Sequence, residues 1–140
     1  MLLPHGTVFA IVDGEKFELY RNTGIEAEPR LEAVPIPELE ATNFSAGVYD
    51  HDRVSRFTPP APKNRVARLD EAAHVAAVAD WLNSQILAHR IDKLVIVADP
   101  RSLGEMRRHF HKEVERVLVA EVPKNLTGRP TAEIVRVLHG

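Results

Sequence analysis

Near the start of the chain, apolar and polar positions follow a pattern that predicts a β-hairpin. Residues 7–12 (TVFAIV) form an apolar run that ends at Asp13-Gly14, a dipeptide that favours the positive-φ positions of a tight turn. Residues 16–21 (KFELYR) alternate apolar and polar positions, as a half-buried returning strand does. The chain therefore begins with two antiparallel strands.

A weaker third strand and a long loop follow the hairpin. Residues 31–36 (LEAVPI) predict a short strand, which we expect at a sheet edge because Pro35 and Pro37 cannot donate ladder hydrogen bonds. From residue 41 to residue 68 no period persists, and prolines stand among glycine, asparagine and serine. This composition predicts a long exposed loop.

The rest of the chain alternates between helical spacing and short apolar runs. The predicted elements are a helix over 69–88 that Asp70 caps, a strand over 93–98, a helix from Pro100 to about Val114, a strand over 117–122 and a helix over 130–138. Asp99 and Pro100 mark the start of the second helix, because an Asp oxygen satisfies free N–H groups and proline loses nothing at the first helical position.

This order of elements predicts an α/β fold. Three strands followed by alternating helices and strands fit a ribonuclease H-like three-layer architecture. Its sheet would be mixed and five-stranded in the order 3-2-1-4-5, with strand 2 antiparallel. Because 140 residues are typical of one domain, we expect a single domain over 1–140 with residues 41–68 as a long basic loop.

Composition narrows the chemistry of the chain. The absence of cysteine excludes disulfides, thiolate zinc sites and thiol nucleophiles. Met1 to Gly6 contain no secretion signal, and no apolar run approaches the roughly 20 residues that cross a bilayer, so we expect a soluble, cytoplasmic protein. No Walker loop, dinucleotide fingerprint or Gly-x-Ser-x-Gly elbow occurs, and we expect no cofactor.

Charge is distributed unevenly along the chain, although the net charge is only −2. Residues 1–52 carry ten acids against three bases, and residues 69–140 balance ten against ten. Between them, residues 53–68 carry no acid and five bases, namely Arg53, Arg56, Lys63, Arg65 and Arg68. This basic segment is the best candidate for binding phosphate groups of a nucleic acid, and a merely solvated loop is the alternative.

Four stretches together carry a resemblance to a known family. They are VDGEKFELYRN at 12–22, the helix around Trp81, VADPRSLGEMRRHFHKEV at 97–114 and EVPKNLTGRP at 121–130. They resemble the bacterial host-attachment family, which is itself similar to bacterial relatives of the archaeal and eukaryotic peptide-release factors and Pelota. The resemblance covers residues 7–22 and 69–138 and hardly touches the middle loop.

The resemblance implies a stand-alone version of the release-factor middle domain, whose corresponding loop enters the ribosomal peptidyl-transferase centre. Release factors that hydrolyse peptidyl-tRNA carry Gly-Gly-Gln there. This chain has no adjacent glycines, and its only glutamine, Gln85, falls in a predicted helix. The implied partner is therefore the ribosome or tRNA, contacted without peptide release. Since no export signal is present, host attachment would be an indirect phenotype.

Two carboxylates suggest a nuclease as an alternative. Asp13 and Asp99 end the first and fourth strands, which the predicted topology places side by side, and Asp70 or Glu71 could supply a third oxygen ligand. Two-metal phosphodiester hydrolysis needs such converging carboxylates. Against this, a turn accounts for Asp13 and a helix cap accounts for Asp99.

The Pro-Arg-x-Leu-Gly joint after the fourth strand has two interpretations. Arg101 and Ser102 lie at a helix N-terminus, where free N–H groups can hold a phosphate or carboxylate. The structural alternative is that Gly104 lets the helix approach the sheet closely while Leu103 packs beneath it. In both interpretations the joint lies at the edge of the sheet, where the fourth strand ends.

Other polar clusters are less specific. Residues 50–52 (DHD) and 109–111 (HFH) lack the i, i+4 histidine pairing of a metal site, so we expect no metal. Residues 124–129 form a polar turn whose ordinary role is to cap the last helix, with phosphate contact as the alternative. Aromatic residues make up only 6% of the chain, which argues against stacking platforms for single-stranded RNA.

Together these observations predict a noncatalytic domain that binds ribosomal RNA, tRNA or a ribosomal protein through the basic loop. A metal-dependent nuclease is the second hypothesis. The third is a protein–protein adaptor whose acidic first half meets a basic partner.

Overall fold

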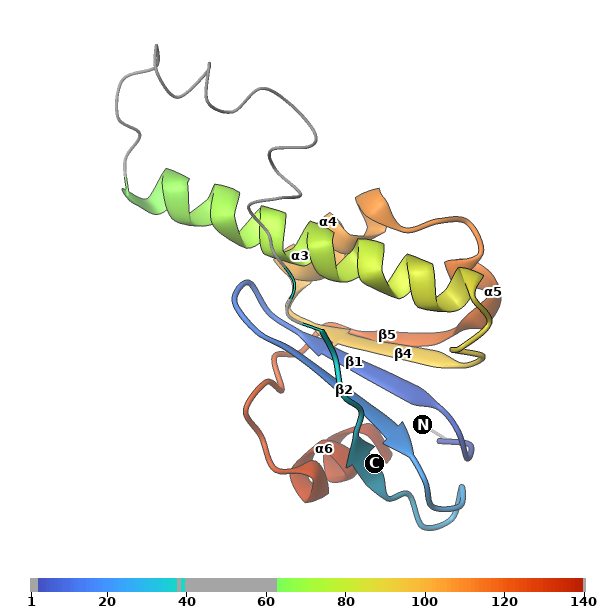
Figure 1. The fold of residues 1–140 in the computed structure, drawn as a ribbon. Helices are drawn as coiled ribbons and strands as arrows, with labels where there is room; N and C mark the ends of the chain where they lie inside the picture. Colours follow the sequence, from blue (N-terminus) through green and yellow to red (C-terminus); the bar gives the residue numbers. More distant parts are fainter. Residues whose placement is uncertain (1–2, 38, 40–62, 140) are drawn as a thin grey trace.

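A five-stranded mixed sheet forms the centre of the protein (Figure 1). The computed structural model describes residues 3–37, 39 and 63–139, with the backbone alone over 63–69. The strands are β1 (Val8–Val12), β2 (Phe17–Asn22), β3 (Leu31–Ala33), β4 (Leu94–Ala98) and β5 (Leu118–Val122). Their order is β3-β2-β1-β4-β5, with β2 antiparallel to both neighbours and β1 parallel to β4, which confirms the predicted sheet.

Helices cover both faces of this sheet. They are α3 (Lys63–Leu87), α4 (Pro100–His109), α5 (Val114–Val117) and α6 (Thr131–His139). Figure 1 shows α3, α4 and α5 on one face and α6 on the other, so the molecule has three layers. None of these helices, nor any other segment described, has the length and apolarity that a bilayer crossing requires.

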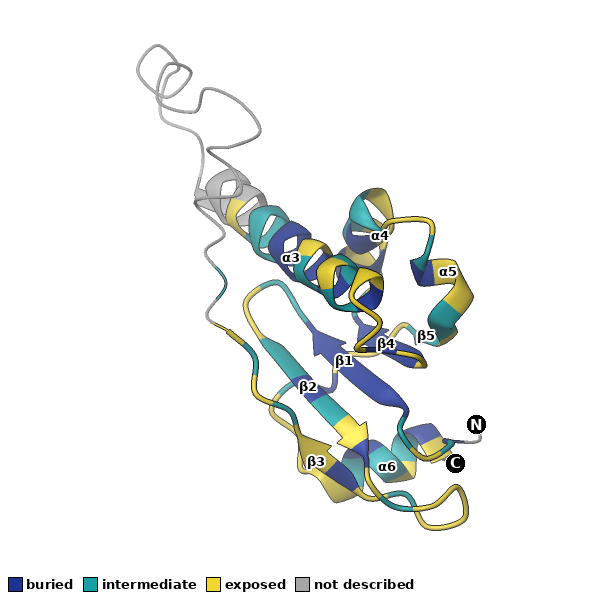
Figure 2. Cartoon of the chain, turned by 45° about the vertical axis from the view of Figure 1, so that its right-hand side comes forward, coloured by how far each residue is buried: buried dark blue, intermediate teal, exposed yellow. Residues whose placement is uncertain are grey.

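Burial on both faces explains why β1 and β4 are apolar throughout (Figure 2). Side chains alternate along each strand, so Val8, Ala10 and Val12 join the core beneath α3 and α4. Phe9 and Ile11 point to the opposite face and join the core beneath α6. The central strands thus belong to two separate cores.

The helix α3 begins six residues earlier than the sequence predicts, at Lys63 rather than Leu69. Residues 63–68 of the predicted loop are therefore helical, and Asp70 lies inside the helix instead of capping it. No proline follows Pro62 before Pro100, so nothing in the sequence interrupts the helix. The remainder of the predicted loop, residues 41–62, lies outside the described residues.

The predicted helix from Pro100 to Val114 is divided in two. The side chain of Asn83 on α3 donates to the carbonyl of His109 (2.9 Å) and accepts from the backbone N–H of His111 (2.9 Å). These bonds occupy backbone groups that a continuing helix would use, and Phe110 adopts an extended conformation. The short helix α5 then returns Val114 to the core, where it is buried.

The C-terminus of α3 ends in a left-handed residue. The N–H of Arg90 donates to the carbonyl of Gln85 (2.9 Å) and that of His89 to Ile86 (3.0 Å), the bonding pattern of a Schellman motif. His89 has φ 59°, a conformation that favours glycine. His89 and Arg90 therefore cap this helix end through their backbone N–H groups.

Replacing His89 with Gly should stabilise the protein by about 0.5–1 kcal/mol, because glycine adopts the left-handed conformation without steric cost. The free energy of unfolding in urea measures this. Ala73→Gly, in the interior of the same helix, is the matched control and should destabilise by about 1 kcal/mol. A destabilised His89→Gly variant would contradict the claim that the left-handed conformation of His89 lowers stability.

Candidate functional site

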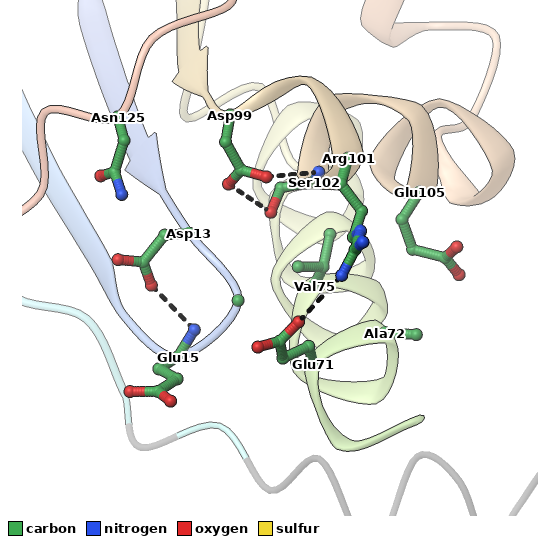
Figure 3. Close-up of a pocket in the computed structure, with 11 residues that line it drawn as sticks. Asp13, Glu15, Glu71, Ala72, Val75, Asp99, Arg101, Ser102, Glu105 and Asn125 are labelled. Atoms are coloured by element: carbon green, nitrogen blue, oxygen red, sulfur yellow. Dashed lines mark hydrogen bonds and ion pairs between the residues drawn. The ribbon is translucent and has the colours of Figure 1, made fainter. Parts of the chain in front are cut away.

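A cavity of about 470 Å³ opens where β1 and β4 end (Figure 3). β1 and β4 are parallel neighbours, and their chain connections leave toward opposite sides of the sheet. Ligands of open α/β sheets bind at this kind of switch point, outside the carboxyl ends of the strands. The cavity is lined by Asp13, Gly14, Glu15, Glu71, Ala72, Val75, Asp99, Arg101, Ser102, Glu105 and Asn125.

Asp13 lies at the end of β1 and is held by three hydrogen bonds. Its Oδ1 accepts from the N–H groups of Glu15 (2.7 Å) and Lys16 (2.6 Å), and its Oδ2 accepts from Thr127 Oγ1 (2.7 Å). Partial burial raises the pKa of Asp13, but these hydrogen bonds and the Lys16 charge outweigh it, and the net pKa is lowered. The predicted turn role of Asp13 is confirmed, and the carboxylate is ionised at neutral pH.

Gly14 is required for space rather than for its backbone angle. A Cβ atom at this position would lie 2.8 Å from both Cγ and Cδ of Glu71 on α3. The predicted positive φ at Gly14 is wrong, because positive φ among the described glycines occurs at Gly6 and Gly128. The hairpin thus makes its closest approach to α3 at Gly14.

Asp99 caps α4, as the sequence predicts. Its Oδ2 accepts from the N–H of Ser102 (3.1 Å), and its Oδ1 accepts from the hydroxyl of the same residue (2.7 Å). Arg101 lies 3.8 Å from a carboxylate oxygen of Glu71. The two residues predicted to bind an anion therefore already have partners within the protein.

Gly104 does not have the packing role that the sequence suggests. It is exposed, and a Cβ atom there would meet no atom within 4 Å. Leu103 and Met106 make the contact with the sheet instead, and both are buried. No contact within the described protein requires a glycine at this position.

Negative charge dominates the cavity. The charged residues that line it are one base, Arg101, and five acids: Asp13, Glu15, Glu71, Asp99 and Glu105. Glu71 is the third carboxylate at this edge, whereas Asp70 is exposed and does not line the cavity. Such a field repels phosphate and favours a cationic group.

Metal binding finds little support in this arrangement. Within residues 3–37, 39 and 63–139, no three His, Cys, Asp or Glu side chains are grouped so that they could hold an ion. His109 lies beside Glu105 (3.1 Å), and His111 falls in the turn that follows α4. The other predicted histidine cluster, residues 50–52, lies outside the described residues.

The loop between β5 and α6 completes the site by contacts that no local pattern reveals. Besides the bond from Thr127 to Asp13, the N–H of Gly128 donates to Glu18 on β2 (2.8 Å). Asn125 Oδ1 accepts from the N–H of Thr127 (3.2 Å) and shapes the turn. In residues 124–129 the sequence predicts a helix cap, whereas these bonds fasten the loop to the hairpin.

The predicted basic segment is only partly described. Arg53 and Arg56 lie outside the described residues, while Lys63, Arg65 and Arg68 fall in the first two turns of α3. Figure 1 shows these turns extending past the β1–β2 hairpin. Three of the five cations therefore belong to a helix instead of a loop.

Comparison with known families points to translation. The family model of bacterial archaeo-eukaryotic release factor family 12 matches residues 6–138. No curated protein matches the chain. The match covers nearly the whole chain and bears out the predicted resemblance to release-factor relatives.

Alanine at Gly104 should raise the free energy of unfolding by about 0.5–1 kcal/mol, because glycine is a poor helix former and the new Cβ has room. The same change at Gly14 should lower it, because Glu71 must move away from the hairpin. Chemical denaturation of both variants measures whether the two changes in the free energy of unfolding have opposite signs. Changes of the same sign and size would contradict this expectation.

Replacing Thr127 with Val should raise the pKa of Asp13 and cost about 1 kcal/mol, because a hydrogen bond to the ionised carboxylate is lost. The folded pKa of Asp13 lies below the ordinary 3.8, so its stabilisation is present above about pH 4 and is lost as pH falls further. Unfolding between pH 2 and pH 7, with NMR titration of the carboxyl carbon, measures both effects. If Asp13 has the same pKa in the Thr127→Val variant and in the unmodified protein, the hydrogen bond from Thr127 does not lower that pKa.

Proposed function

Because the chain belongs to bacterial archaeo-eukaryotic release factor family 12, which suggests a translation-associated role, we propose that it binds ribosomal RNA or tRNA without catalysing a reaction. The observation that carries this proposal is the basic segment. Residues 53–68 hold five cations and no acid, and three of these cations enter the first turns of α3. Arginine and lysine at this density favour contact with a phosphate backbone.

The position of α3 supports this interpretation. Its first turns extend past the edge of the sheet, so they do not pack against the strands (Figure 1). The positive end of the helix dipole adds to the charge of Lys63, Arg65 and Arg68. The acidic cavity, by contrast, would repel an RNA backbone.

The absence of a peptide-release motif supports a noncatalytic role. Peptidyl-tRNA hydrolysis by the relatives that this chain resembles needs a glutamine amide on a flexible glycine pair. Gln85 is the only glutamine of the chain, and it belongs to α3 and lines a groove at the far end of that helix. We therefore assign binding to this protein and no hydrolysis of the peptidyl ester.

A second function, as an adaptor for a basic protein, is favoured by the acidic cavity. Five carboxylates and one arginine line it, so a lysine or arginine side chain of a partner would be attracted. This function predicts a partner that stays bound after ribonuclease treatment. The nuclease hypothesis predicts magnesium- or manganese-dependent RNA cleavage that disappears in Asp13→Asn.

Exchanging Arg53, Arg56, Lys63, Arg65 and Arg68 for Gln should weaken co-sedimentation with ribosomes and flatten its salt dependence. Each lost phosphate contact lowers the slope of log K against log salt by about 0.7–0.9. The matched control removes five cations elsewhere, at Arg107, Arg108, Lys112, Arg116 and Lys124. An unchanged slope in the first variant, or an equal change in both, would contradict the proposal.

A further inference from the structure

A second groove, of about 350 Å³, lies between α3, β2 and the residues that follow β3. Val8 at the start of β1 lines it, whereas Asp13 at the other end of β1 lines the acidic cavity. The groove is lined by Val8, Leu19, Arg21, Val34, Pro35, Trp81, Gln85, Arg90 and Ile91. None of these lining residues is acidic, so the two hollows differ in the sign of their charge.

Two arginines give this groove its positive charge. Arg21 on β2 and Arg90 after α3 are both exposed, and Arg21 Nη2 lies 3.4 Å from the carbonyl of Arg90. Neither takes part in an ion pair within the described part of the chain. Glu32 faces Arg21 across the β2–β3 pair, but no ion pair within 4 Å joins them there.

Five other arginines of the described protein do have a carboxylate partner. Each of the following has a carboxylate oxygen within 4 Å: Arg101, Arg107, Arg108, Arg116 and Arg129. Among the described residues Arg30 and Arg136 also lack an ion pair, but only Arg21 and Arg90 of these four line the groove. Two guanidinium groups on one groove can donate several hydrogen bonds to a phosphate.

Trp81 provides an aromatic wall beside the two cations. The ring is half-buried and meets Phe17 edge to face, with centroids 5.7 Å apart and an interplanar angle of 68°. This contact holds the indole in one orientation. Gln85, one turn further along α3, adds an amide that can both donate and accept hydrogen bonds.

We propose that this groove binds one nucleotide of single-stranded RNA, with the base against Trp81 and the phosphate at Arg21 and Arg90. Base stacking on an aromatic ring, phosphate contact with arginine and an amide beside the base are the elements of such sites. A nucleotide supplies a flat apolar face and a negative charge within one unit. An acidic peptide would need two suitably spaced residues, one to supply the flat apolar face and one to supply the negative charge.

The proposal rests on the proposed RNA-binding function and deepens it. α3 spans 25 residues, with the basic segment at its start and the groove near its end. At 1.5 Å per residue, the helix separates Lys63 from Trp81 by roughly 27 Å, the reach of a few extended nucleotides. One RNA strand following α3 would therefore contact both regions.

Trp81 is the only tryptophan, so its fluorescence reports on this groove alone. We expect hexauridylate or hexaadenylate to quench it in a titration. Arg21→Gln combined with Arg90→Gln should weaken binding roughly tenfold or more and lower the salt slope by about 1. The control variant, Arg107→Gln with Arg116→Gln, should bind as the unmodified protein does, and a thermal melt verifies that each variant is folded.

A second readout, the anisotropy of a labelled RNA hexamer, separates this proposal from the general one. RNA binding by anisotropy, with unchanged Trp81 emission and no effect of the arginine variant, would overturn the groove assignment and leave the proposed function standing. No binding in either readout, and no co-sedimentation with ribosomes, would overturn both. Tighter binding of hexaglutamate than of RNA would assign the groove to an acidic peptide, and equal binding of AMP would assign it to a free nucleotide.

Discussion

The parallel pairing of β1 with β4 is the constraint on which the rest of the structure depends. The two strands run in register from Val8 opposite Leu94 to Val12 opposite Ala98, and helices cover both of their faces. No water reaches this pair, so a charged side chain within it would carry a large desolvation cost. Polar and charged groups are consequently placed at the strand ends, and the acidic cavity and the second groove form there.

This constraint also separates the charges of the molecule. At the carboxyl end of the pair, carboxylates converge around a cavity, and the hydrogen bonds of Asp13 keep its carboxylate ionised. Beyond the other end lies a groove with Arg21 and Arg90 and no acid in its lining. This charge separation would repel a polyanion from the first hollow and attract it to the second, which is the orientation that the proposed RNA binding requires.

Two carboxylates that the sequence offers as catalytic candidates, Asp13 and Asp99, stabilise the fold. Asp13 joins the hairpin to the β5–α6 loop through Thr127, and Asp99 caps α4 through Ser102. Each of these carboxylates has its oxygens engaged in hydrogen bonds, which accounts for its position at the switch point.

The hairpin and the Asp99 cap were readable from the sequence, because each arises from contacts between residues close along the chain. The strand order followed from the succession of strands and helices and the few ways in which such elements connect. Only the tertiary structure decided the rest. It revealed that Asn83 interrupts a helix predicted to be continuous, that Gly14 makes room for Glu71, and that Trp81 shares a groove with two arginines. These contacts join segments far apart in sequence, and the packing of the sheet and helices alone determines which distant side chains meet.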